Sequence, residues 1–341
     1  MDEDFGVGVK RFFAIPLLVA ATGVVVLAGL IGYSRPAPLA SESGPIDFSI
    51  AIAAVYDDLP ARQLLAMRDG ERLTYRIYVP KGDAGRRLIL LVHGSAWHGM
   101  QFHSMASALA DAGLGTVVVP DLRGHGEAPQ RRGDVDYIGQ LEDDLADLIG
   151  QVRAQSVYDE VVLGGHSSGG GLVVRFAGGE HGALVDRYLV MAPFLKYNAP
   201  TTRPNSGGWA SVATPRIIGL TILNEFGITV FNHLPVISFA MPKVVLDGPY
   251  GATATTSYSF RLNTSFAPRS DYGGDLAKMT QPFLLIAGAQ DEAFDASLYA
   301  QTISEHTSSG TYVVLPGINH IGVTTEPVAI EAVARWISDR D

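Results

Sequence analysis

Short apolar runs alternate with amphipathic stretches along most of this chain. The strands of a buried parallel sheet read as continuous apolar runs, and such runs lie at residues 88–92, 116–119, 161–163, 188–191, 283–287 and 311–315. Apolar side chains recur at helical spacing in residues 102–112, 138–152 and 327–337. Strands that alternate with helices in this way predict an α/β fold, with a mostly parallel central sheet covered by helices on both faces.

Two segments depart from this alternation. Residues 63–67 and 73–79 flank Asp69-Gly70, a dipeptide typical of tight turns, and predict a hairpin. Residues 195–278 mix Pro, Gly, Asn and Thr with bulky apolar runs over a length unusual for a loop. Because this segment lies between two strands, we expect an inserted lid above the carboxyl ends of the strands, where ligands bind in open α/β sheets.

The N-terminal residues 12–33 carry no charged side chain, and no helical phase gives them a polar face. A helix of this length, rising about 1.5 Å per residue, spans the ~30 Å hydrocarbon core of a bilayer. Lys10 and Arg11 precede the stretch and only Arg35 follows closely, which predicts a cytoplasmic N-terminus. The alternative is a cleaved signal peptide, which typically has a shorter apolar region and a better small-residue cleavage site.

These features predict three parts of the chain. We expect a single-pass membrane anchor at residues 1–33, a linker rich in Pro, Ser and Ala at 34–47, and a main domain at 48–341. With a cytoplasmic N-terminus, the main domain is expected to be extracytoplasmic or periplasmic.

Composition narrows the partners and the chemistry. The 341-residue chain has a formal net charge of −10 and no cluster of basic residues, which argues against a nucleic-acid partner. It has no cysteine, which excludes disulfides, thiol nucleophiles and Cys-ligated metals. The nine histidines form no His-x-x-x-His pair and no mixed cluster with carboxylates in the sequence. We expect neither a metal nor a cofactor.

The strongest chemical signal is the run Gly165-His166-Ser167-Ser168-Gly169, which lies between a strand-like run and the start of a helix. In that context, Gly-x-Ser-x-Gly predicts a nucleophile elbow, a sharp turn that exposes the serine hydroxyl. The two glycines allow the strand and the helix to cross where a Cβ would clash. Ser167 is therefore the candidate nucleophile.

A serine nucleophile needs a base and a carboxylate that orients the base. Asp291 follows the strand 283–287, and we expect it to be the acid, with Glu292 and Asp295 as alternatives. His320 follows the strand 311–315, and we expect it to be the base. Both residues come just after the carboxyl ends of strands, at the edge where the elbow lies.

The serine also needs backbone donors for the oxyanion that forms on attack. The N–H of Ser168 begins a helix, where an unpaired donor and the helix dipole favour negative charge. The loop after strand 88–92 supplies a second donor, which we expect to be the N–H of Ser95, with Ala96 as the alternative. In the same loop, His93 is expected to bond loop backbone rather than to carry a proton.

With these residues in order, the chain resembles the α/β-hydrolase superfamily, and most closely its monoacylglycerol lipase and lysophospholipase group. The resemblance spans residue 65 to the C-terminus and rests on His93-Gly94-Ser95, Asp121-Leu122-Arg123-Gly124-His125-Gly126, Gly165-His166-Ser167-Ser168-Gly169, Gly288-Ala289-Gln290-Asp291 and Asn319-His320. It implies a serine esterase whose lid lies between the sixth and seventh core strands. Glu127 departs from the group's pattern, and the lid does not visibly match it.

The turn from Asp121 to Gly126 looks like a signature of this group. We expect it to be structural, with Arg123 bonding backbone carbonyls and with Gly124 and Gly126 permitting tight bends. Asp121 precedes the serine, so we do not expect it to be the acid of the triad.

The resulting hypothesis is a membrane-anchored serine hydrolase that cleaves carboxylic esters through a Ser-His-Asp triad and an acyl-enzyme. Its expected partners are a small-molecule ester or lipid, such as a monoacylglycerol or lysophospholipid, and the membrane. Three alternatives remain: an aminopeptidase or amidase with the same triad, a perhydrolase, and a catalytically idle binding protein. Dehalogenases and epoxide hydrolases resemble this scaffold with Asp in place of Ser at the elbow.

Overall fold

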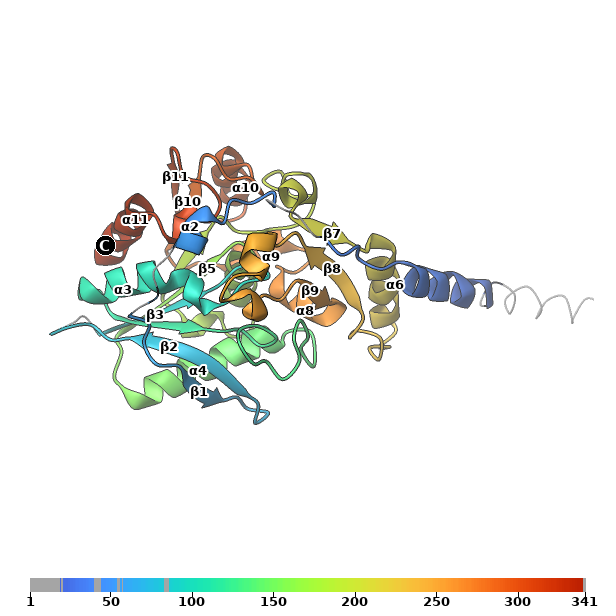
Figure 1. Ribbon diagram of the computed structural model, residues 1–341, viewed down its shortest axis with the longest axis horizontal. Coiled ribbons are helices and arrows are strands. Elements are labelled where there is room, and N and C mark those ends of the chain that lie inside the picture. The colour runs from blue at the N-terminus through green and yellow to red at the C-terminus, as the bar shows by residue number, and fades with distance from the viewer. Residues whose placement is uncertain are drawn as a thin grey trace, which may run out of the picture.

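A twisted eight-stranded sheet forms the centre of the molecule, with strands in the order β1-β2-β4-β3-β5-β6-β10-β11 (Figure 1). The computed structural model describes residues 19, 21–39, 44–53, 56, 58–82 and 86–339. β1 pairs with β2, and β2 with β4, in antiparallel fashion, and the remaining neighbours in the sheet are parallel. The strands are β1 (Gln63–Ala66), β2 (Arg72–Tyr78), β3 (Arg87–Val92), β4 (Thr116–Pro120), β5 (Glu160–His166), β6 (Arg187–Met191), β10 (Phe283–Gly288) and β11 (Gly310–Leu315).

Helices cover both sides of this sheet. Figure 1 shows α3 and α4 on opposite sides, and α3 contacts α11 while α4 contacts α5. The helices that connect the strands are α3 (His103–Asp111), α4 (Gln140–Gln155), α5 (Ser168–Ala177) and α10 (Tyr299–Ser304), and α11 (Pro327–Ser338) follows the last strand. Every residue of β3 and β10 is buried, as continuous apolar runs in a parallel sheet should be. The predicted mostly parallel α/β sheet is confirmed.

The segment between β6 and β10, which includes the expected lid at 195–278, has regular structure of its own. It contains a three-stranded antiparallel sheet in the order β7-β8-β9. Its elements are β7 (Ala210–Val212), α6 (Thr214–Glu225), β8 (Pro235–Phe239), α7 (Lys243–Leu246), β9 (Ser257–Ser259), α8 (Phe260–Phe266) and α9 (Tyr272–Lys278). α8 and α9 pack on α5, so this segment is attached to the helix that begins at the elbow.

The N-terminal region is described in part. Residues 21–33 form a helix that projects from the domain beside α6 (Figure 1). Much of the membrane anchor predicted at 1–33 lies outside the described residues, and among the described ones no helix is both long enough and apolar enough to cross a membrane.

Residues 34–47, predicted to be a linker, make fixed contacts where the structure describes them. Ile46 is buried, and the Asp47 N–H donates to Glu292. Phe48, at the start of the main domain, packs against the rings of Trp97 and Trp209 before the short helix α2 (Ser49–Ala53). These contacts bring the segment close to the carboxyl edge of the sheet, because Glu292 follows β10.

A buried ion-pair network holds α5 in place. Glu142 of α4 accepts hydrogen bonds from Arg175 of α5 and from Arg269, and Arg269 also binds Asp275 of α9. The Glu142 and Arg175 side chains are each only 8% exposed. Since a buried charge is costly unless it is paired, this network ties three helices to one another.

Removing the central carboxylate should destabilise the fold. We expect Glu142→Ala to lower the free energy of unfolding by about 3–5 kcal/mol, because it leaves the buried Arg175 guanidinium without its partner. The matched control is Asp159→Ala, which breaks the exposed pair with Arg86 and should cost no more than about 1 kcal/mol. Urea unfolding measures both, and equal losses would contradict the assignment.

Candidate functional site

The chain makes a sharp, strained turn between β5 and α5. Ser167, the single residue between them, has φ 56° and ψ −120°, a backbone conformation that L-residues rarely adopt. A Cβ on Gly165 would lie 2.3 Å from the Gly169 carbonyl oxygen, and one on Gly169 would lie 2.4 Å from the carbonyl oxygens of Val92 and His93. The two glycines are therefore required by the close crossing of strand and helix, as the sequence predicts.

Backbone hydrogen bonds hold this strained turn. The Ser167 N–H donates to the Met191 carbonyl at 2.9 Å, and the Ser167 carbonyl accepts from the N–H groups of Gly171 and Phe194, each at 3.0 Å. Conformations of this kind persist only where the surroundings over-determine them, and they concentrate at functional sites.

Asp291 and His320, although 29 residues apart, form a buried pair. His320 Nδ1 lies 2.8 Å from Asp291 Oδ2, and the two residues are 2% and 3% exposed. Asp291 Oδ1 accepts the N–H groups of Ala293 and Phe294 at 2.8 and 2.9 Å. With its other oxygen fixed by backbone, the carboxylate orients the imidazole, which donates from Nδ1 and keeps Nε2 as an acceptor.

The two alternative acids have other roles. Glu292 accepts the backbone N–H of His320 at 2.9 Å and so holds the loop that carries the histidine, but it does not bond the ring. Asp295 accepts the Ser297 N–H at 3.1 Å and caps a short 3-10 helix. Of the three carboxylates considered from the sequence, the structure pairs only Asp291 with the His320 ring.

Ser167 and His320 line the same cavity, together with Gly94, Ser95 and Gln101. Among the described hydrogen bonds, none joins the Ser167 hydroxyl to the His320 ring. Catalytic hydrogen bonds in sites without substrate are often long or poorly aligned and tighten only when substrate binds.

A second cavity also reaches Ser167 and shares Ser95 and Trp209 with the first. Ser95, Ser167 and Ser168 form its polar wall, and the rest is largely apolar, including Trp209, Ile237, Phe239, Phe266 and Phe294. This cavity is open to solvent on one part of its surface. Most of this apolar lining comes from the segment inserted between β6 and β10.

The two predicted oxyanion donors have no acceptor among the described residues: neither the Ser95 nor the Ser168 N–H forms a hydrogen bond there. The alternative donor is occupied, because the Ala96 N–H donates to the Tyr258 hydroxyl at 2.6 Å. The same loop is fixed from the inserted segment by Trp209, whose indole N–H donates to Ser95 Oγ at 3.0 Å. His93 bonds backbone at Gly94 and Leu122, as predicted.

Sequence reasoning missed a hydrogen-bonded chain that links three loops of the site. The Gly94 N–H donates to Gln101 Oε1 at 3.0 Å, so the Gln101 amide nitrogen faces His166 Nδ1, at 2.7 Å. His166 Nε2 then donates to the His320 carbonyl at 2.9 Å. These hydrogen bonds join the loop after β3, the elbow and the loop that carries His320.

The protonation state of His166 follows from its surroundings. Complete burial lowers the pKa of His166 well below its ordinary value, and the neighbouring His320 ring adds to the effect. The ring is therefore neutral and carries one proton, on Nε2. His166 occupies the variable position of the elbow motif, and a lone glutamine gives no sequence signal. These hydrogen bonds are therefore visible only in the structure.

The Asp121–Gly126 turn is structural, but not in the way the sequence suggests. Arg123 binds carboxylates rather than carbonyls: Asp144 at 2.7 Å, and also Asp69 and Glu71. Asp121 accepts the Gly99 N–H and the Thr74 hydroxyl, each at 2.8 Å, and is not part of the Asp291–His320 pair.

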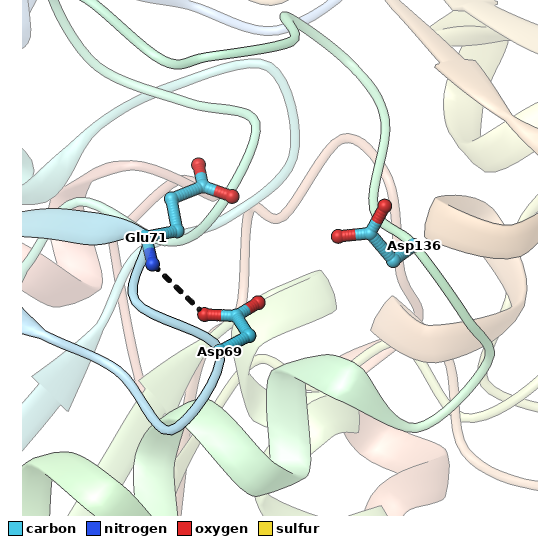
Figure 2. A group of neighbouring side chains, drawn as sticks. All are labelled: Asp69, Glu71 and Asp136. Carbon is cyan, nitrogen blue, oxygen red and sulfur yellow. Dashed lines mark hydrogen bonds between the residues drawn. The ribbon is translucent and has the colours of Figure 1, made fainter.

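Three carboxylates beside Arg123 have oxygen atoms within 4.8 Å of one another, a spacing compatible with metal ligands. Figure 2 shows Asp69 and Glu71 on the β1–β2 turn, facing Asp136 on a separate loop. The Arg123 guanidinium already binds Asp69 and Glu71, and Gln140 Nε2 donates to Asp69 and Asp136 at 3.0 and 3.4 Å. The Arg123 guanidinium therefore already supplies the positive charge beside these carboxylates.

Known hydrolases are similar to this chain in sequence and in fold. A model of the family described as serine aminopeptidase, S33, matches residues 83–327. A monoacylglycerol lipase from Mycolicibacterium smegmatis is 32% identical over 79% of this chain and 93% of its own length. A monoglyceride lipase from Homo sapiens is 24% identical over 84% of this chain and 92% of its own.

Solved structures share the fold. A soluble variant of monoglyceride lipase from Saccharomyces cerevisiae, in complex with a substrate analog, superposes with a TM-score of 0.62 and 17% identity, and the match covers 84% of this chain and 96% of that one. At this identity the likeness concerns the fold alone.

The hydrogen bonds made by Gln101 can be tested by measuring the stability of variants. We expect Gln101→Leu to lower the free energy of unfolding by about 2–4 kcal/mol, because it leaves the buried Gly94 N–H and His166 Nδ1 unpaired. Gln101→Glu keeps the acceptor for Gly94 but faces His166 Nδ1 with a second acceptor, so the ring must gain a proton. The free energy of unfolding that Gln101→Glu loses, relative to the unmodified protein, should therefore be smaller at pH 6 than at pH 8. Urea unfolding at the two pH values measures this. An equal loss of unfolding free energy at both pH values for Gln101→Glu, or an unchanged unfolding free energy for Gln101→Leu, would contradict these hydrogen bonds.

Proposed function

The chain belongs to the serine aminopeptidase S33 family and is an ester hydrolase of the monoacylglycerol lipase-like α/β-hydrolases, and we propose that Ser167, His320 and Asp291 carry its reaction. The hydrogen bond between His320 Nδ1 and Asp291 is the observation that supports this most strongly. It leaves Nε2 free to accept a proton, in a cavity that the strained Ser167 also lines.

The proposed reaction proceeds in two steps. His320 Nε2 takes the proton of Ser167 Oγ, which attacks the ester carbonyl, and the N–H groups of Ser95 and Ser168 stabilise the oxyanion. The His320 imidazolium, steadied by Asp291, then gives that proton to the leaving alcohol as the ester C–O bond breaks. Water, deprotonated by His320, attacks the acyl-enzyme, and the proton returns to Ser167 as the acid leaves.

We propose a lipid-like ester, such as a monoacylglycerol or a lysophospholipid, as the substrate. The cavity beside the serine is walled by Trp209, Ile237, Phe239 and Phe266, which suit an acyl chain rather than a charged group. The relatives from Mycolicibacterium smegmatis and Homo sapiens are a monoacylglycerol lipase and a monoglyceride lipase.

We propose that the inserted segment acts as a lid and that the N-terminal region anchors the enzyme to a membrane. The uncharged stretch 12–33, preceded by Lys10 and Arg11, supports a single-pass anchor with a cytoplasmic N-terminus. The catalytic domain is then extracytoplasmic or periplasmic.

A peptidase is the second candidate, because the matching family model is described as a serine aminopeptidase. An aminopeptidase must recognise the free α-ammonium group of its substrate, for which a carboxylate is the natural partner. The apolar cavity beside Ser167 has no carboxylate among its lining residues, which favours the ester.

Substitution of the triad tests the assignment. Ser167→Ala should lower kcat for a soluble p-nitrophenyl ester on the order of 10⁶-fold, and Asp291→Asn on the order of 10⁴-fold. Glu292→Gln is the matched control, because Glu292 bonds the His320 backbone but not its ring, and its loss should be far smaller. A loss for Glu292→Gln equal to that for Asp291→Asn would move the acid to Glu292.

Substrate preference separates the two candidate reactions. We expect turnover of p-nitrophenyl esters to exceed that of aminoacyl-naphthylamides and to rise with acyl-chain length, since a longer chain buries more apolar surface in the cavity. Steady-state kcat/KM across a chain-length series measures this. Flat activity across the series would speak against a lipid-like substrate, and faster amide turnover would favour the peptidase.

A further inference from the structure

The loop that follows β3 is held in place by the segment inserted between β6 and β10. The Ala96 N–H donates to the Tyr258 hydroxyl at 2.6 Å, and the Ala96 carbonyl accepts from the Thr255 N–H at 3.0 Å. Ala96 has φ 63°, a backbone conformation that residues other than glycine rarely adopt. Because these bonds fix Ala96 before any substrate is present, the preceding residue, Ser95, is fixed with it.

Trp209 attaches the side chain of Ser95 to the same segment. Its indole N–H donates to Ser95 Oγ at 3.0 Å. Its ring packs against those of Phe48 and Phe239, with centroids 5.6 and 5.7 Å apart. Trp209 and Ser95 are 6% and 9% exposed. The Ser95 oxygen therefore has a fixed position in a buried setting.

This contact leaves the proton of the Ser95 hydroxyl unused. An indole N–H can only donate, so Ser95 Oγ is the acceptor, whereas a serine hydroxyl can also donate one hydrogen bond of its own. Within the part of the chain that the structure describes, the Ser95 hydroxyl donates to no residue. A buried donor without an acceptor costs free energy, and such donors concentrate at sites with a catalytic role.

The hydroxyl of Tyr258, in the same region, has the opposite arrangement. Complete burial lowers the pKa of His125 well below its ordinary value, so this ring is neutral, and its Nδ1 donates to the Arg123 carbonyl at 3.0 Å. His125 Nε2 is then an acceptor, and it lies 2.7 Å from the Tyr258 hydroxyl. Tyr258 thus accepts from Ala96 and donates to His125. Of these two hydroxyls, Ser95 is the one whose proton is left for a ligand.

The Ser95 hydroxyl lies where the two cavities of the site meet. Ser95, Ser167 and Trp209 line both the cavity that holds His320 and the apolar cavity. An ester carbonyl that Ser167 attacks must lie beside that serine, and its oxygen gains negative charge on attack. No lysine or arginine is among the described residues that line either cavity. The charge on this oxygen must therefore be stabilised mainly by neutral donors.

We propose that the Ser95 hydroxyl donates a hydrogen bond to the oxyanion, as a third donor beside the N–H groups of Ser95 and Ser168, and that Trp209 orients it. The inference rests on the proposed function, because it concerns the same attack of Ser167 on an ester. It makes Ser95 a catalytic residue through its side chain, and Trp209 a positioning residue. The inserted segment then helps to stabilise the transition state in addition to shaping the cavity.

Substitution by alanine isolates the hydroxyl, because Ser95→Ala keeps the backbone N–H. We expect Ser95→Ala to lower kcat for a soluble p-nitrophenyl ester about 10²-fold with little change in KM, because the bond strengthens as the oxyanion forms. Affinity for an alkyl trifluoromethyl ketone, which a serine converts to a tetrahedral adduct with an anionic oxygen, should fall by a similar factor. Urea unfolding verifies that the variant is folded.

A second comparison separates donation to the oxyanion from support of the indole. Trp209→Phe removes the indole donor and keeps the Ser95 hydroxyl, so kcat should fall less than in Ser95→Ala, by about ten-fold at most. Ser95→Ala combined with Trp209→Phe should lie at least about ten-fold below Trp209→Phe alone, because the hydroxyl itself is lost. This comparison leaves no unpaired indole, so it also serves if Ser95→Ala alone is unstable.

The outcomes distinguish this proposal from the proposed function. Equal kcat values for Trp209→Phe and the double variant would show that Ser95 serves only as an acceptor for the indole, and would overturn the proposal. Unchanged kcat and ketone affinity in Ser95→Ala would overturn it as well, without affecting the triad. An unmodified chain that neither turns over the ester nor binds the ketone would contradict the proposed function instead.

Discussion

The close crossing of β5 and α5 is the constraint on which the rest of the site depends. Gly165 and Gly169 let the strand and the helix approach where any side chain would strike backbone. The chain can then turn within one residue, Ser167, whose backbone is held in a rarely populated conformation. The turn places Ser167 on the wall of the cavity and, at the same time, leaves the Ser168 N–H at a helix N-terminus.

The strain at Ser167 is sustained by contacts on every side of the turn. Its peptide groups bond β6 and the loop after it, and the buried Glu142–Arg175 pair fixes α5 to α4. His166, the residue before the serine, bonds the carbonyl of His320. The nucleophile and the proposed base are thus connected through backbone and a neutral histidine before any substrate is present, which is the preorganisation that fast acyl transfer needs.

Much of this arrangement is predictable from local patterns. Buried strands and amphipathic helices have clear periodicities, and the carboxyl edge of a parallel sheet collects whatever follows its strands, which is why Ser167, Asp291 and His320 could be chosen from order alone. Excluding Glu292 as the partner of the His320 ring needed coordinates, because the two carboxylates are adjacent in sequence. They diverge only because one points at the ring and the other at the backbone of the same histidine.

Contacts between distant segments were not predictable in this way. Nothing local indicates that Arg123 binds Asp144 and two carboxylates of the β1–β2 turn, or that Gln101 bridges Gly94 and His166. The seat of the N-terminal helix on α6 depends equally on tertiary packing, with Gly219 giving room to Ile31. Such pairings are set by the fold as a whole, and single positions in a sequence carry no periodic signal for them.

The most direct measurement of the central claim is covalent labelling of the full-length chain with a fluorophosphonate, followed by mass spectrometry of its peptides. The account predicts one stoichiometric adduct, on the Ser167 hydroxyl, formed far more slowly when His320 is replaced by alanine. A chain that stays unlabelled, or that carries the adduct on another serine, would contradict the claim that the strained turn makes Ser167 the nucleophile.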